Sequence, residues 1–119
     1  MKVLVCEDDA TMSFIINHHL KSFGHEAVLV TDVTSAIEKL SADLPDIVIT
    51  DYILPDLTGL ELIDYASKLS PKPLPGILMS AMELDFLEQQ EGIKLKNSYL
   101  KKPFTAAELK EKIEGLLAA

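Results

Sequence analysis

The 119-residue sequence has little of three things: cysteine, basic residues and long apolar runs. Its single cysteine, Cys6, cannot close an internal disulfide, so nothing in the composition requires an oxidising compartment. The N-terminal stretch MKVLVCEDD reaches acidic residues too early for a secretion signal, and no run approaches the ~20 apolar residues of a membrane span. Because 11 basic residues face 19 acidic ones, the formal charge is −8, which disfavours nucleic acid and anionic membranes as partners. These absences predict a cytoplasmic protein that binds neither.

Short apolar runs alternate with helical patterns along the whole chain. The runs are often β-branched and cover residues 3–6, 27–30, 47–50, 76–79 and 98–100. They are largely apolar rather than alternating, which is typical of parallel strands buried on both faces. Apolar residues at helical spacing predict helices within residues 12–23, 32–40, 60–69, 84–90 and 105–117. We therefore expect one α/β domain over residues 1–119, with a parallel sheet covered by helices on both faces and no effector domain.

Capping signals mark the starts of two of these helices. Thr31 or Asp32 is the predicted N-cap of the second helix, and Thr105 and Glu108 form a capping box before the last one. We also expect Glu108 and Lys112 to pair four residues apart on the exposed side of that helix.

Charged and polar side chains follow four of the five predicted strands. These are Glu7, Asp8 and Asp9 after the first strand, Asp51 after the third, Ser80 after the fourth and Lys102 after the fifth. In open α/β sheets ligands bind beyond the carboxyl ends of the strands, so these side chains are expected to converge on one pocket.

Crowded carboxylates repel one another by several kcal/mol per close pair at intermediate dielectric, and a hard divalent cation relieves that repulsion. Mg²⁺ with oxygen ligands is the natural candidate. A carboxylate beside Mg²⁺ and a lysine can attack phosphorus, because both cations stabilise charge on the equatorial oxygens. The alternative for any one acid is a loop-capping or solvated residue, and it weakens when four strand ends carry such groups together.

Four motifs in this order and spacing resemble the receiver domain of two-component response regulators, over essentially all 119 residues. They are the acid pair after VLVC, then DIVITDYILPDLTG, ILMSA and SYLKKPF. The resemblance, which is closest to chemotaxis-type regulators, implies a flavodoxin-like (βα)5 sandwich with the parallel strands in the order 2-1-3-4-5. It also implies a module that accepts a phosphoryl group from a sensor histidine kinase or a phosphotransfer protein. Such a module is not an enzyme, beyond its own phosphorylation and slow autodephosphorylation.

The resemblance also assigns roles to the strand-end residues. Asp51 is implied as the phosphoacceptor, Asp8 as a direct Mg²⁺ ligand and Glu7 as a ligand through water. Asp51 itself and the backbone carbonyl of Ile53 complete the implied metal site, in which Mn²⁺ can substitute. Asp9 falls one place beyond the acid pair and is left out.

The remaining implied roles concern switching. Ser80 and Lys102 contact the phosphoryl group, and the bond between Lys102 and Pro103 is implied to be cis. Tyr99 matches an aromatic that moves inward when Ser80 follows the phosphoryl group, and Gly59 matches the helix start after the phosphorylation site. The readout face is the fourth helix, fifth strand and fifth helix, presented to a partner protein or effector domain. A phosphorylation-dependent homodimer stays open.

Two apolar residues depart from the family pattern. Ile53, two after Asp51, and Met82, two after Ser80, stand where polar residues assist dephosphorylation in the family. Apolar side chains there orient no water, so we expect an aspartyl phosphate that lasts minutes or longer. The alternative is that neither side chain faces the phosphoryl group.

Other functions fit the residues less well. A phosphohydrolase of the haloacid dehalogenase type needs an acid two residues after its nucleophile, where this chain has Ile53. A flavin or nucleotide binder needs a phosphate loop after the first strand, where the acids would repel the phosphate. A pseudo-receiver that takes no phosphoryl group stays open, as does the choice between a stand-alone protein and part of a longer regulator.

The remaining chemistry-bearing side chains have simpler interpretations. His18, His19 and His25 are predicted to be solvated or packed, because no cysteine or acid at ligand spacing frames them. Cys6 is interpreted as a small strand hydrophobe rather than a redox sensor.

Overall fold

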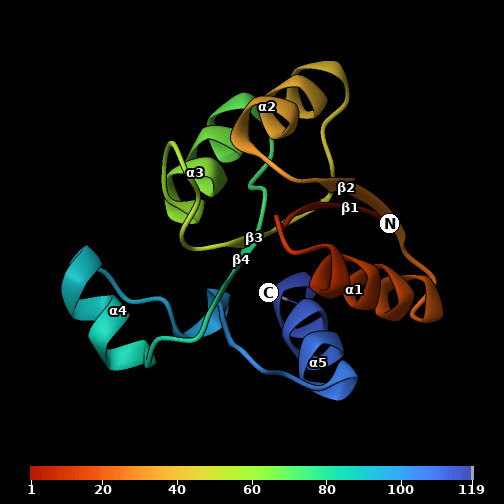
Figure 1. Cartoon of the computed structure of the whole chain (residues 1–119). Coiled ribbons are helices and arrows are strands. Elements are labelled where there is room, and N and C mark those ends of the chain that lie inside the picture. Colours follow the sequence, from red (N-terminus) through yellow and green to blue (C-terminus); the bar gives the residue numbers. More distant parts are fainter. Residues whose placement is uncertain (119) are drawn as a thin grey trace.

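The computed structural model describes residues 1–118 and contains one five-stranded, all-parallel sheet in the order β2-β1-β3-β4-β5. The strands are β1 (Lys2–Cys6), β2 (Glu26–Val30), β3 (Ile47–Asp51), β4 (Gly76–Ser80) and β5 (Tyr99–Lys101). The helices are α1 (Ala10–Ser22), α2 (Val33–Ala42), α3 (Gly59–Leu69), α4 (Leu84–Glu91) and α5 (Ala106–Leu117), with a short 3₁₀ turn η1 (Lys96–Ser98) before β5. Figure 1 shows these elements along the chain. The predicted α/β fold and strand order are confirmed.

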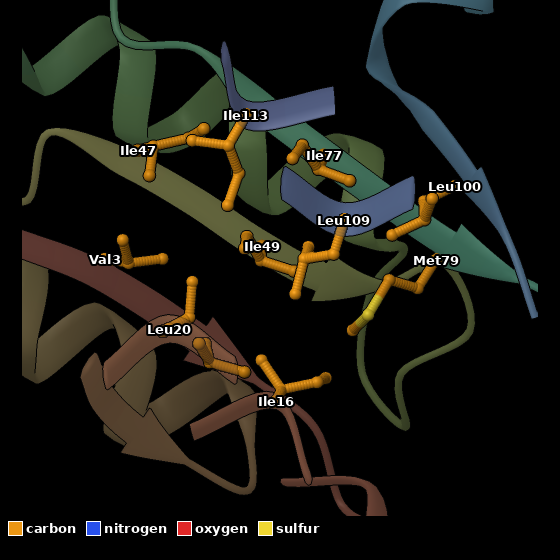
Figure 2. Close-up of a cluster of buried hydrophobic side chains, with 11 residues drawn as sticks. Val3, Ile16, Leu20, Ile47, Ile49, Ile77, Met79, Leu100, Leu109 and Ile113 are labelled. Carbon is orange, nitrogen blue, oxygen red and sulfur yellow. The ribbon is translucent and has the colours of Figure 1, made fainter. Parts of the chain in front are cut away.

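Helices cover both faces of the sheet, and this explains the continuous apolar runs. Alternate residues of β1 enter different cores: Val3 and Val5 pack with α1 and α5, whereas Leu4 and Cys6 pack with α2 and α3. Figure 2 shows the first of these cores, in which Ile16 of α1 and Leu109 of α5 pack with side chains from the strands. Each fully buried aliphatic side chain of this kind contributes roughly 1.5–3 kcal/mol. A strand buried on both faces therefore has little room for polar residues before its end.

A third, smaller core lies under α4. It contains Tyr52, Leu78, Leu87, Leu95 and Tyr99. Leu78 lies between Ile77 and Met79, which face α1 and α5, so α4 shares the opposite face of the sheet with α2 and α3. Within the helices described, none is long and apolar enough to cross a membrane.

The helix starts follow local capping chemistry. Asp32, not Thr31, caps α2 by accepting the Ser35 amide at 2.7 Å. The Thr105–Glu108 capping box is confirmed at α5, and an equivalent Thr58–Glu61 box, which was not predicted, opens α3.

Two sequence expectations near β5 were wrong. The Glu108 carboxylate accepts the Thr105 amide at 2.9 Å, while the Lys112 ammonium donates to the Lys96 carbonyl at 3.1 Å, so the expected ion pair between Glu108 and Lys112 is replaced. The strand itself starts at Tyr99 rather than at Ser98, because the Ser98 amide donates to the Leu95 carbonyl at 2.8 Å and closes the 3₁₀ turn.

Candidate functional site

Three carboxylates meet at the carboxyl ends of β1 and β3. These two strands are neighbours, and Cys6 pairs with Thr50, so the residues that follow, Glu7 and Asp51, end side by side. Glu7 is 1% exposed and Asp51 8% exposed, whereas Asp8 is exposed. Carboxylate oxygens of Glu7, Asp8 and Asp51 lie within 4.8 Å of one another. The predicted convergence of these acids therefore occurs in the fold.

Lys102 supplies the positive charge in this cluster. Its backbone amide donates to the Ser80 carbonyl at 2.8 Å, which continues the pairing of β4 with β5 and holds the residue at the edge of the sheet. Its ammonium donates to Glu7 Oε1 at 2.8 Å and also to Asp51 Oδ1. The bond from Lys102 to Pro103 is cis, in agreement with the resemblance. Lys102 thus binds both buried carboxylates at once.

Burial and charge shift two groups of this cluster. Burial, followed by the hydrogen bond with Asp51, raises the pKa of the Glu7 carboxyl against the lowering influence of Lys102. Burial alone would lower the pKa of the Lys102 ammonium, but its hydrogen bonds to Asp51 and Glu7 outweigh burial and raise it. Lys102 is therefore a permanent cation at neutral pH, and Glu7 is harder to ionise than an exposed glutamate.

The donor set suits a hard divalent cation. The cluster holds three carboxylates and one ammonium, which contacts two of them, so an excess of negative charge remains when all three carboxylates ionise. The donors are all oxygens, from Asp51 at the end of β3 and from the two residues directly after β1, of which Asp8 is open to solvent. Such a set fits Mg²⁺ or Mn²⁺ better than a soft metal. Asp9 lies outside this group because its side chain caps α1, accepting the Met12 amide at 2.9 Å.

Ser80 and Tyr99 are joined directly. Ser80 ends β4 next to β3 and is 9% exposed, and its hydroxyl oxygen accepts the Met82 amide at 3.1 Å. Tyr99, 6% exposed, turns inward and its hydroxyl donates to the Ser80 carbonyl at 3.0 Å and to the Met82 carbonyl. The tyrosine therefore holds the loop that joins β4 to α4.

The two apolar residues that depart from the family pattern have different surroundings. The Ile53 side chain is 68% exposed, on a segment held by an isolated bridge to Thr58. Met82 is half-buried and packs against the core under α4. Ile53 is thus open to solvent beside the end of β3, whereas Met82 is turned at least in part toward the interior.

The backbone behind Asp51 is packed tightly against the start of α3. The Gly59 amide donates to the Tyr52 carbonyl at 2.7 Å, and a Cβ atom at Gly59 would lie 2.0 Å from the Asp51 carbonyl oxygen. Only glycine fits this approach.

The acid cluster includes neither the cysteine nor a histidine. Cys6 is fully buried, and burial raises the pKa of its thiol to about 11, as expected for an unreactive strand residue. Within residues 1–118, the one group of three metal-ligating side chains is the acid cluster, which contains no histidine.

A parallel α/β sandwich with a cluster of carboxylates and a lysine at the carboxyl edge of its sheet defines the class of this protein. The sequence profile described as the response regulator receiver domain matches residues 3–114. The chain belongs to this family, the receiver domains of two-component signalling, which are signalling modules rather than enzymes with a separate substrate.

The relatives of this chain include proteins of about its own length and proteins about twice as long. The chain is 38% identical to the chemotaxis protein CheY1 of Helicobacter pylori, covering 98% of this chain and 97% of that protein. It is 25% identical to the alkaline phosphatase synthesis transcriptional regulatory protein PhoP of Bacillus subtilis, of which it covers only 48%. Among solved structures, a response regulator receiver domain protein from Clostridium thermocellum superposes with a TM-score of 0.81 at 28% identity, over 98% of this chain and 94% of that one.

Proposed function

We propose that this chain is a phosphorylatable receiver, in which Asp51 accepts a phosphoryl group from the phosphohistidine of a sensor histidine kinase or phosphotransfer protein. The observation that carries the proposal is the meeting of the Glu7, Asp8 and Asp51 carboxylates with the Lys102 ammonium at one edge of the sheet. In the transfer an Asp51 carboxylate oxygen bonds to phosphorus, the phosphorus–nitrogen bond breaks, and the imidazole leaves with its electron pair.

The proposal gives each member of the pocket a task. Asp8, Asp51 and the Ile53 backbone carbonyl would ligate Mg²⁺ directly, and Glu7 would do so through water. When bound, Mg²⁺ would supply positive charge opposite the phosphoryl oxygens. Lys102 already contacts Asp51 and would stabilise the added negative charge from the other side, because a phosphoryl group is more negative than the carboxylate alone.

The same proposal includes a route from the pocket to an output face. Ser80 would move to bond the phosphoryl oxygen, and its carbonyl accepts the Tyr99 hydroxyl that also contacts the Met82 carbonyl. A shift of Ser80 would therefore change the loop that leads into α4. We propose that α4, β5 and α5 present the result to a partner protein or effector domain, in a cytoplasmic receiver formed by residues 1–119.

The test is incubation with acetyl phosphate and Mg²⁺, followed by intact mass. Wild type should gain one phosphoryl group, Asp51→Asn should gain none, and Asp56→Asn should behave as wild type because Asp56 is an exposed acid of the following loop. Equal labelling of wild type and Asp51→Asn would exclude Asp51 as the acceptor, and no labelling of the wild type would favour a pseudo-receiver.

A further inference from the structure

Tyr52 follows the proposed phosphoacceptor directly and is fixed at its backbone on two sides. Its amide donates to the Met79 carbonyl of β4 at 2.9 Å, and its carbonyl accepts the Gly59 amide at the start of α3 at 2.7 Å. Its side chain is 3% exposed and belongs to the core under α4. A side chain that bonds to Tyr52 is therefore held in a fixed position relative to the end of β3.

The Tyr52 side chain reaches the carboxyl-terminal end of α4. Its hydroxyl donates to a Glu91 carboxylate oxygen and accepts from the Gln90 amide nitrogen at 3.4 Å. A tyrosine hydroxyl keeps its proton at neutral pH and can therefore donate to this carboxylate. A hydrogen bond to an ionised carboxylate is about twice as strong as a neutral one.

Other contacts also hold α4: the Glu88 carboxylate accepts the Leu95 amide at 2.6 Å, and Leu84 packs against the core under the helix. Of the eight residues of α4, all of which the structure describes, only Leu87 is buried. Its N-cap, Glu83, makes no side-chain capping hydrogen bond, and Phe86 is 57% exposed. In Figure 1 the α4 ribbon lies apart from those of α2 and α3, and Leu60 and Ile63 of α3 pack against the core under α4. In the last turn, Tyr52 contacts Gln90 and Glu91, and the Leu95 amide contacts Glu88.

The two ends of α4 are held by two different tyrosines. Tyr99 contacts the carbonyls of Ser80 and Met82, just before the helix begins, whereas Tyr52 contacts Gln90 and Glu91 in its last turn. Of these two tyrosines, only Tyr99 contacts Ser80. The second end stays tied to β3.

We propose that Tyr52 is a positioning residue that anchors the carboxyl-terminal end of α4 to the phosphoacceptor strand, so that displacement of Ser80 and Tyr99 pivots the helix about this anchor. The anchor stands on the contacts of Tyr52 alone, while the pivot rests on the proposed function. The two parts need separate readouts.

The anchor is tested without phosphate, by amide hydrogen exchange on Tyr52→Phe, which keeps the ring and removes the hydroxyl. Amides 87–92 should exchange about tenfold faster than in wild type, the amount expected for one lost charge-assisted hydrogen bond, while β3 and β4 amides are unchanged. Glu91→Ala should give the same increase, and the double variant no further one. Glu91→Gln, which keeps an oxygen acceptor, should restore most of the protection. Tyr65→Phe, on the half-exposed tyrosine of α3, is the matched control and should change nothing.

Three results would overturn the anchor: unchanged exchange in α4, an equal increase in β3 and β4, or additive effects of Tyr52→Phe and Glu91→Ala. The additive result would show that the two groups act separately.

The pivot is tested by amide NMR shifts on addition of beryllofluoride with Mg²⁺. In wild type the shifts at 82–86 should exceed those at 88–92, and in Tyr52→Phe they should become comparable. Large shifts at 88–92 in wild type would contradict the pivot. Absence of beryllofluoride binding to wild type would count against the proposed function, and the exchange experiment on the anchor would still be readable.

Discussion

Gly59→Ala should damage the fold and the pocket together. An added Cβ would lie 2.0 Å from the Asp51 carbonyl oxygen, 2.9 Å from the Asp51 carbonyl carbon and 2.9 Å from Thr50 Cγ2. Two of these atoms are backbone and the third belongs to a fully buried strand residue, so no exposed side chain can rotate away. Relief requires α3 and the end of β3 to move apart, which also stretches the 2.7 Å hydrogen bond from Gly59 to Tyr52.

The expected cost follows from two opposed effects. Overpacking a closed site typically costs about 1–3 kcal/mol, and a backbone clash belongs at the upper end of that range. Replacing glycine by alanine inside a helix returns about 0.5–1 kcal/mol at most. The free energy of unfolding should therefore fall by about 2 kcal/mol. With a urea m value of about 1–2 kcal/mol/M for a small domain, the midpoint falls by about 1–2 M. Acetyl phosphate should also label Asp51 more slowly, because the clash displaces its backbone.

Gly115→Ala is the matched control. Gly115 lies on the exposed side of α5, and beyond its chain neighbours and the adjacent backbone of the helix a Cβ there would meet no described atom within 4 Å. Its urea midpoint, followed by circular dichroism, should stay the same or rise, because only helix propensity changes. A Gly59→Ala midpoint equal to that of wild type would refute the steric reasoning. An equal fall in both variants would show that the loss comes from glycine replacement in general.

Three further outcomes follow from the site and its surroundings. Mg²⁺ should raise the thermal midpoint of wild type by relieving carboxylate repulsion, and Asp8→Asn should abolish the rise; an undiminished response would remove Asp8 from the metal site. Burial and the N-terminal ammonium 3.3 Å away lower the pKa of His25 from 6.5, so the stability it contributes is present above pH 6.5 and is lost as pH falls through the folded value. His25→Asn should flatten the dependence of the thermal midpoint on pH in this range. The control His18→Asn, on the exposed side of α1, should leave that dependence unchanged. The aspartyl phosphate should last minutes or longer, and Ile53→Asn, at the exposed side chain beside β3, should shorten its half-life several-fold; a wild-type half-life of a few seconds without a phosphatase would contradict this.

The strands could be predicted closely because burial on both faces leaves a simple pattern. Val3 and Leu4 face opposite cores, so both must be apolar and the run is continuous until β1 ends before Glu7. The start of β5 was harder. Ser98 is a suitable strand residue, but its amide is already used by the 3₁₀ turn, which no run of apolar residues reveals. The capping box at Thr58 and Glu61 was readable from residue type and spacing, although only the resemblance indicated the helix start at Gly59.

The site was predictable where topology alone places the residues. In a parallel sheet the ends of β1 and β3 lie at one edge, so residues directly after them meet regardless of side-chain details. Asp8 and Asp9 were separable only by the resemblance, and the structure adds the reason: Asp9 is used as the N-cap of α1. The ion pair between Lys102 and Glu7 could not be predicted. It depends on where β5 ends and on the buried glutamate side chain turning toward the lysine.

Tyr52 marks the limit of sequence reasoning in this chain. Its ring fills an apolar position, and leucine or phenylalanine would satisfy the same local pattern after Asp51. What distinguishes tyrosine is a hydroxyl whose partners lie 38 and 39 residues further on, and helical periodicity in α4 gives no reason to connect Glu91 with β3. Such pairings are visible only when the sheet and its covering helices are assembled. The reactive residues at the strand ends can thus be recognised from local sequence, whereas the hydrogen bonds from Tyr52 to α4 can be recognised only in the folded structure.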